Sequence, residues 1–116
     1  MHRHDNLHIW KKSTSLCVII YKKTKQFPED EKFGLINQLR RAAVSVPSNI
    51  AEGSRRSSKK EFKHFLLTAS GSLAEIDTQL FLSKELGYLE EGDYNQLKDS
   101  ASEISKMIAS FIKSME

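Results

Sequence analysis

The chain has 116 residues, of which 39% are hydrophobic and 28% are charged, and its formal net charge is +3. This length suits one domain, predicted to span residues 1–116, and the composition is too apolar for a disordered chain. No run approaches the roughly 18 uncharged apolar residues that a membrane span needs, and no signal-peptide pattern is present. A single cysteine cannot form an intrachain disulfide. We therefore expect a cytoplasmic protein with no membrane partner.

Charge is unevenly distributed along the chain. Residues 38–63 hold seven Lys and Arg residues and two acids, whereas residues 75–116 hold four lysines and nine acids. Such asymmetry indicates either a basic face for a polyanion or charge complementarity between subunits.

A first helix is predicted over residues 6–25. Its apolar residues recur at steps of three and four, which is typical of one buried helix face. The expected stripe consists of Trp10, Thr14, Cys17, Val18 and Tyr21. Phe27-Pro28 is expected to end this segment, because the residue before proline is pushed out of the α region.

A second helix is predicted to begin at the acids 29–31, which favour the positive end of a helix dipole. Its stripe consists of Leu35, Ile36, Leu39, Ala42, Ala43 and Val46. Pro47 removes one backbone hydrogen bond and crowds the preceding turn, so the helix either ends there or kinks and continues. Continuation is favoured, because Ile50 and Ala51 extend the stripe. Gly53 is then the expected C-terminal cap.

A third helix is predicted from a capping box in which Ser58 is the N-cap and Glu61 reaches back to its amide. The seam consists of Phe62, Phe65, Leu66, Ala69, Leu73, Ile76 and Leu80, with Leu67, Phe81 and Leu82 outside it. Gly87 is expected to end the helix.

A fourth helix is predicted over residues 91–115, where apolar residues alternate threes and fours without a miss. They are Tyr94, Leu97, Ala101, Ile104, Ile108, Phe111 and Met115. Short connections force neighbouring helices antiparallel. The fold class is therefore expected to be all-α: an antiparallel, up-down-up-down four-helix bundle with its second helix kinked at Pro47.

Histidines offer two possible metal patterns, and neither is complete. His2, His4 and His8 lie near a terminus that supplies no third or fourth ligand in fixed geometry. Glu61 and His64 match the Glu-x-x-His spacing of di-iron bundles, but such sites need the motif twice. We predict no metal and no cofactor.

Catalytic patterns are also incomplete. Some helical-bundle ribonucleases place a His four to six residues after an Arg, but seven residues separate Arg56 from His64 here. No serine has a histidine placed beside it by spacing, and Cys17 falls on the expected core stripe. We therefore expect no enzyme and no catalytic residues.

A basic middle segment remains as the candidate nucleic-acid-binding site. It consists of Arg40, Arg41, Arg55, Arg56, Lys59, Lys60 and Lys63. Basic groups at a helix start oppose the helix dipole, so their placement suggests a function such as binding phosphates. The alternative is a solvated face, or salt bridges to the acidic fourth helix of a neighbouring subunit.

The run from Gln38 to Gly53, QLRRAAVSVPSNIAEG, closely resembles the central motif of a known family. Its members are four-helix-bundle proteins encoded in intervening sequences of bacterial large-subunit ribosomal RNA genes. Further matches are Phe33-Gly34-Leu35, Arg56-Ser57, Glu61-Phe62, Phe65-Leu66, residues 69–75 and Leu86-Gly87-Tyr88. The similarity covers essentially the whole chain.

This resemblance implies four antiparallel helices and relatives that assemble as ring-shaped pentamers. One relative is the accessory variability determinant of diversity-generating retroelements, a basic pentamer that binds nucleic acid and a reverse transcriptase. Arg40 and Arg41 match the family's paired arginines, and Arg56 matches its basic residue after the glycine. These residues either touch RNA or hold the ring together. The acidic C-terminal third departs from a uniformly basic surface.

Together these observations favour a non-enzymatic, homo-oligomeric protein that binds nucleic acid and prefers structured RNA to DNA. Little base specificity is expected, because no aromatic residue interleaves with the basic ones. The alternative is a protein-interaction scaffold or accessory subunit, whose basic residues pair with acids of a partner or sister subunit.

Overall fold

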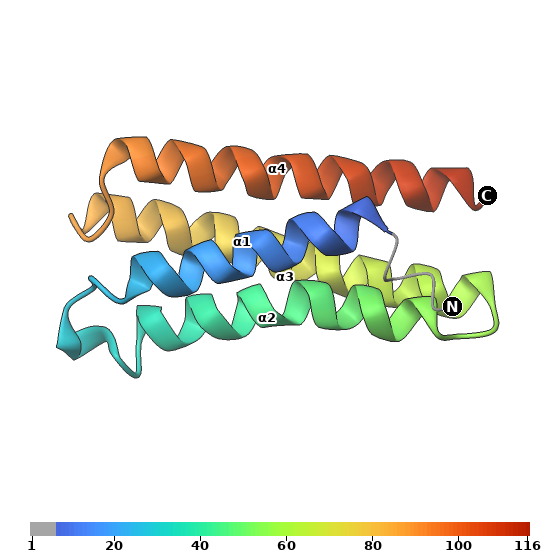
Figure 1. Cartoon of the computed structure of the whole chain (residues 1–116), viewed down its shortest axis with the longest axis horizontal. Helices are drawn as coiled ribbons and strands as arrows, with labels where there is room; N and C mark the ends of the chain where they lie inside the picture. The colour runs from blue at the N-terminus through green and yellow to red at the C-terminus, as the bar shows by residue number, and fades with distance from the viewer. Residues whose placement is uncertain (1–6) are drawn as a thin grey trace.

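The computed structural model describes residues 7–116. They form helices α1 (His8–Thr24), α2 (Leu35–Ser54), α3 (Lys59–Glu85) and α4 (Glu91–Ser114), with a short 3-10 helix η2 (Glu29–Glu31) between α1 and α2 (Figure 1). The described part of the chain contains no strand. The prediction of an all-α four-helix bundle is confirmed. His2 and His4 lie outside the described residues.

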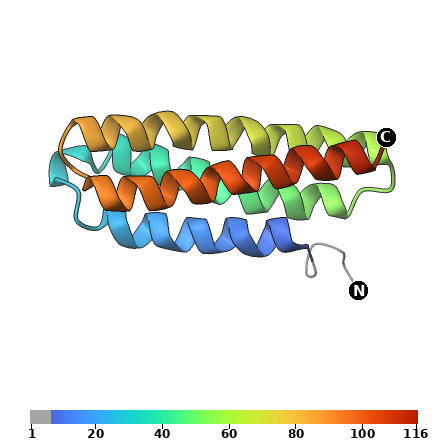
Figure 2. The ribbon, with the colours of Figure 1, turned by 90° about the horizontal axis from the view of Figure 1, so that it is seen from above.

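The four helices pack around one elongated core. Each of α1 and α3 packs against both α2 and α4, and the molecule measures 43 × 22 × 20 Å. Figures 1 and 2 show successive helices reversing direction along the long axis. The α2–α3 connection and the C-terminus therefore share one end, and the other two connections share the opposite end. No helix within residues 7–116 is long and apolar enough to cross a membrane.

The predicted stripe of α1 is wrong by about one residue. The buried positions are Ile9, Ser13, Leu16, Ile20 and Thr24. Val18 and Tyr21 are exposed, whereas Trp10 and Cys17 are half-buried and pack against the core. The two hydroxyl residues tolerate burial because each bonds to its own helix: Ser13 Oγ donates to the Trp10 carbonyl at 2.9 Å, and Thr24 Oγ1 donates to the Ile20 carbonyl at 2.8 Å.

Helix α2 begins later than predicted. The three acids form η2 instead of its first turn, and Gly34 is the N-cap. The carboxylate of Glu31 accepts a hydrogen bond from the Leu35 amide at 3.0 Å, so one acid still caps the helix from outside it. Helix α2 then continues through Pro47 to Ser54, as predicted; the kink itself stays a prediction.

The apolar stripe of α2 is confirmed, with one residue at its edge. Leu35, Leu39, Ala42, Ala43, Val46 and Ile50 are buried. Ile36 is half-buried and packs against this core. Pro47 is also buried, so the helix carries its proline on a packed face.

Gly53 lies inside α2 and is not the predicted C-terminal cap. Gly87 is the only glycine with positive φ in the described chain. A Cβ atom at Gly53 would lie 2.8 Å from Phe65 Cβ and 2.9 Å from Phe62 Cδ1. The sequence therefore needs glycine here because α3 approaches the α2 backbone closely, before the chain turns between the two helices.

Gly53→Ala is expected to lower the free energy of unfolding by about 1 kcal/mol. Overpacking costs about 1–3 kcal/mol, and the better helix propensity of alanine returns up to about 1 kcal/mol. Urea denaturation measures the difference. Gly92→Ala is the control, because a Cβ atom there would meet nothing within 4 Å. Equal effects of the two substitutions would contradict the close-packing explanation.

Both predicted ends of α3 are confirmed. Ser58 is the N-cap and its hydroxyl accepts from the Glu61 amide at 3.1 Å, although the Glu61 carboxylate meets the Ser58 hydroxyl and not the predicted amide. After Glu85 the chain turns through Gly87 at φ 81°. The Tyr88 amide donates to the Ser83 carbonyl and the Gly87 amide to the Lys84 carbonyl, both at 2.9 Å. This is a Schellman motif, which glycine accommodates without strain.

The predicted seams of α3 and α4 form most of the core. Every predicted position on α3 is buried except Phe65, which is half-buried. On α4 the stripe is buried from Tyr94 to Ile108, and Phe111 and Met115 pack against its end. Leu67, Phe81 and Leu82 are exposed, as their place outside the seam predicted.

Candidate nucleic-acid interface

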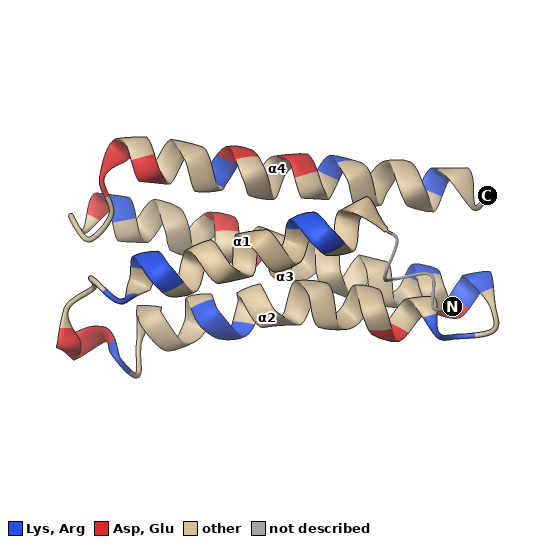
Figure 3. Cartoon of the chain, in the orientation of Figure 1, with Lys and Arg blue, Asp and Glu red and all other residues tan. Residues whose placement is uncertain are grey.

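The seven predicted phosphate-binding residues do not form one cluster. Arg40 and Arg41 lie in the first half of α2, and the other five lie where α2 ends and α3 begins. We call this second group the α2–α3 junction; it consists of Arg55, Arg56, Lys59, Lys60 and Lys63. At 1.5 Å per residue, Arg41 and Arg55 are roughly 20 Å apart along the helix. Figure 3 shows the basic residues of the junction at one end of the bundle.

Arg40 is committed to packing between α1 and α2. Its guanidinium lies over the Tyr21 ring, 4.7 Å from the ring centroid. Its Nε donates to Thr24 Oγ1 at 2.9 Å, and its Nη2 donates to the Tyr21 carbonyl at 3.2 Å. The Tyr21 carbonyl in the last turn of α1 thus gains a cationic donor, which also suits the negative end of that helix.

Two residues of the α2–α3 junction have carboxylate partners in the same chain. Arg56 pairs with Glu52, one turn earlier on α2, and its guanidinium lies 5.0 Å from the Phe65 ring centroid. Lys63 Nζ lies 3.2 Å from a Glu116 carboxylate oxygen. All four charged side chains are substantially exposed, so each pair contributes about 0–1 kcal/mol and can exchange its carboxylate for a phosphate.

Lys59 and Lys60 differ from their neighbours. They are the first two residues of α3 and both are exposed. Neither side chain forms an ion pair or hydrogen bond with another described residue. Arg55 and Arg56 follow the end of α2, where positive charge is favourable, but the two lysines oppose the dipole of α3. Only the lysines therefore lack a local electrostatic reason for their position.

The residues considered for catalysis lie apart from this junction or lack chemical partners. Cys17 is half-buried on α1. Burial raises the pKa of its thiol, so the thiol stays protonated near neutral pH and is a poor nucleophile. His64 is exposed and stacks edge-on against Phe65, 5.5 Å between ring centroids. Within residues 7–116, no three His, Cys, Asp or Glu residues come together to hold a metal ion.

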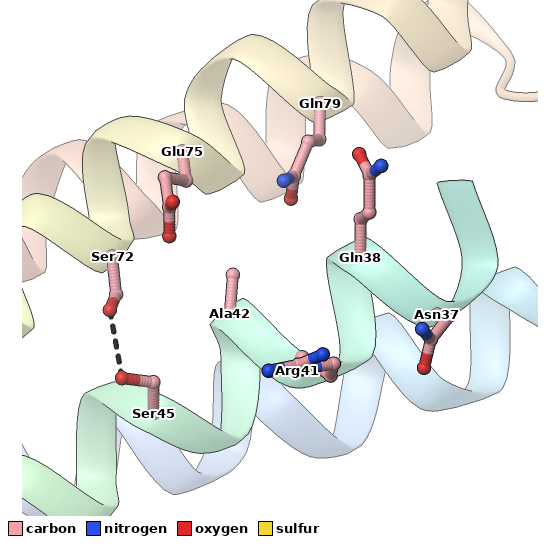
Figure 4. Close-up of a pocket in the computed structure, with 8 residues that line it drawn as sticks. All are labelled: Asn37, Gln38, Arg41, Ala42, Ser45, Ser72, Glu75 and Gln79. Atoms are coloured by element: carbon pink, nitrogen blue, oxygen red, sulfur yellow. Dashed lines mark hydrogen bonds between the residues drawn. The ribbon is translucent and has the colours of Figure 1, made fainter. Parts of the chain in front are cut away.

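A polar groove of about 400 Å³ separates the exposed edges of α2 and α3. It is lined by Asn37, Gln38, Arg41, Ala42 and Ser45 from α2, and by Ser72, Glu75 and Gln79 from α3 (Figure 4). The Ser72 hydroxyl donates to the Ser45 hydroxyl at 2.8 Å, and Asn49 Nδ2 donates to Ser45 Oγ at 3.0 Å. Residue types and spacing alone missed Glu75 and Gln79 as members of a site.

The sequence matches the model of the 23S rRNA-intervening sequence protein family over residues 5–110. The chain belongs to this family. A crystal structure of a protein of unknown function from the S23 ribosomal protein family of Bacteroides thetaiotaomicron is similar, with a TM-score of 0.82 and 27% sequence identity. The similarity covers 90% of this chain and 98% of that chain. No curated protein matches the chain significantly.

In this member of the 23S rRNA-intervening sequence protein family, the stretches that signalled the resemblance meet in space. The central motif, residues 38–53, lies in α2, and residues 69–75 lie in α3. They face each other across the polar groove, joined by the hydrogen bond between Ser45 and Ser72. The second matched stretch therefore contains Glu75, whereas Gln79 lies outside both stretches.

Proposed function

We propose that this chain is a non-enzymatic, homo-oligomeric RNA-binding protein that holds phosphates at the α2–α3 junction. One observation carries the proposal: Lys59 and Lys60 are exposed in the first turn of α3, with no carboxylate partner among the described residues. Arg55 and Arg56 lie just before them, at the end of α2. The family name refers to an intervening sequence of 23S rRNA, which supports an RNA-associated role.

The chemistry of the junction favours contacts to the backbone of the nucleic acid. Lysine is a flexible point charge that can bind phosphates in many geometries. Phe62 is buried, and Phe65 is half-buried beside the Arg56 guanidinium. Neither ring is available as an open stacking platform for bases, so the proposed binding has little sequence preference.

Lys59→Glu/Lys60→Glu is expected to abolish retention of a structured RNA on a filter at low salt. Reversed charges repel phosphates and release no counterions. Lys59→Ala/Lys60→Ala is expected to make the negative slope of log K against log salt less steep by about 1.5, since each phosphate contact contributes roughly −0.7 to −0.9. Far-UV circular dichroism checks that both variants keep their helices.

Lys22→Glu/Lys25→Glu is the matched control. Both residues are exposed near the end of α1, and the charge change is the same. This control is expected to retain RNA. Equal loss in both double variants would mean that only net charge matters, and undiminished retention in the junction variant would refute the site.

A protein-interaction scaffold is the second candidate. It is favoured by the carboxylate partners of Arg56 and Lys63 and by the packing role of Arg40, because these basic groups already serve protein contacts. In that case Lys59→Glu/Lys60→Glu leaves RNA retention unchanged and lowers the mass of the assembly, which light scattering measures.

A further inference from the structure

We infer that a second copy of this chain docks on the outer face of α2 and α3, with Arg41 of one copy meeting Glu75 of the other. We call this surface the α2–α3 face; it consists of the polar groove together with Val44 and Gly71. The inference rests on the homo-oligomer of the proposed function and names the surface that builds it. Three independent features of the face point to a protein occupant.

The first feature is a pair of opposite charges without partners. Arg41 and Glu75 line the groove from opposite helices, and both are exposed. Neither forms an ion pair or hydrogen bond with any described residue. Figure 4 shows Arg41 lying along α2 and Glu75 projecting from α3. A second copy placed on this face brings one cation to one anion, which is the charge complementarity that self-association requires.

The second feature is a buried acceptor that nothing satisfies. The Gln79 Oε1 atom is buried and accepts no hydrogen bond within residues 7–116. Its side chain lies in the groove, opposite Gln38 (Figure 4). An unsatisfied buried polar atom destabilises the chain that carries it. A donor group on another chain can bond this amide if the Gln79 side chain turns outward into the groove, so association offers the oxygen the partner that it lacks in the isolated chain.

The third feature is a glycine that the single chain does not need. Gly71 lies in the middle of α3, and a Cβ atom there would meet nothing within 4 Å. Glycine at an exposed helical position stabilises a helix less than alanine does. A close approach of another backbone explains it. Gly71 precedes Glu75 by one turn, and Val44, which is 42% exposed, follows Arg41 at a step of three, so both lie beside the charged pair.

The charge pair is tested by reversal and exchange, with mass measured by light scattering. Arg41→Glu and Glu75→Arg are each expected to reduce the wild-type mass to that of one chain, 13.3 kDa. The double variant Arg41→Glu/Glu75→Arg is expected to restore the assembly. Lys11→Glu, an exposed charge reversal on α1, is the control and is expected to keep the wild-type mass.

The glycine is tested by Gly71→Leu, which is expected to fold at least as stably as the wild type and to be monomeric. Gly92→Leu is its control, because that glycine also faces open space, but on α4. Single variants that keep the wild-type mass would overturn the inference and leave the homo-oligomer intact. A measured mass of 13.3 kDa for the wild type, with or without a small molecule bound in the groove, would overturn both the docking surface and the homo-oligomer. RNA retention is measured separately, so its failure affects only the proposed function.

Discussion

Leu16→Ala is expected to lower the free energy of unfolding by about 2–5 kcal/mol. Leu16 is 1% exposed on the buried side of α1 and belongs to the central core. Removing its side chain loses the transfer free energy and leaves a cavity, because close-packed neighbours relax only in part. Such a loss is a large fraction of the roughly 5–15 kcal/mol that stabilises an ordinary domain.

Val18→Ala is the matched control, two residues further along the same helix. Val18 is 52% exposed, so its truncation is expected to change the free energy of unfolding by less than about 0.5 kcal/mol. Urea denaturation of both variants, at one protein concentration, measures the contrast. A larger effect at Val18 than at Leu16 would mean that α1 presents its other face to the core, as the sequence pattern had predicted.

This pair also shows why the orientation of α1 could not be predicted. The run from residue 16 to residue 21 is apolar throughout, so two stripes shifted by one residue fit it almost equally well. The buried stripe contains Ser13 and Thr24, which count as polar in any pattern. They are buried because their hydroxyls bond to the helix carbonyls, an effect that periodicity does not register. In α4, only polar residues lie between the stripe positions from Tyr94 to Ile104, and the prediction was right.

The candidate site was predictable in composition but not in arrangement. The local charge count singled out all seven basic residues as candidates, but it could not show which of them already have partners within the chain. Arg40 and Arg41 are adjacent in sequence, yet a rotation of about 100° per residue sends one toward α1 and the other toward α3. Likewise the Lys63–Glu116 pair joins residues 53 positions apart. Only the packing of the helices reveals such partners.

The two proposed surfaces are separable by experiment because they lie on different parts of the bundle. The α2–α3 junction is at one end, whereas Arg41 lies roughly 20 Å from it along α2. Charge changes at that distance interact weakly, since the Debye length is about 8 Å at physiological salt. The effect of changing Lys59 and Lys60 on RNA retention is therefore expected to be independent of the effect of changing Arg41 and Glu75 on the mass of the assembly.

Arg40→Ala is expected to lower the free energy of unfolding by about 2–3 kcal/mol. The substitution removes two charge-assisted hydrogen bonds that join α2 to α1, and bonds to charged groups contribute about 1.5–3 kcal/mol each before the freed groups regain water. It also removes the contact with the Tyr21 ring, worth about 0.5–1 kcal/mol at an exposed site. Thermal and urea unfolding measure the loss.

Arg41→Ala provides the comparison within the same turn of α2. Arg41 has no partner among the described residues, so its loss is expected to change the unfolding of the isolated chain by less than about 0.5 kcal/mol. If Arg40 instead binds phosphate, Arg40→Ala must make the negative slope of log K against log salt less steep by about one and leave the free energy of unfolding unchanged. In that case the paired arginines share one role. The contacts of Arg40 favour two separate roles instead: Arg40 joins α1 to α2, and Arg41 faces outward from α2.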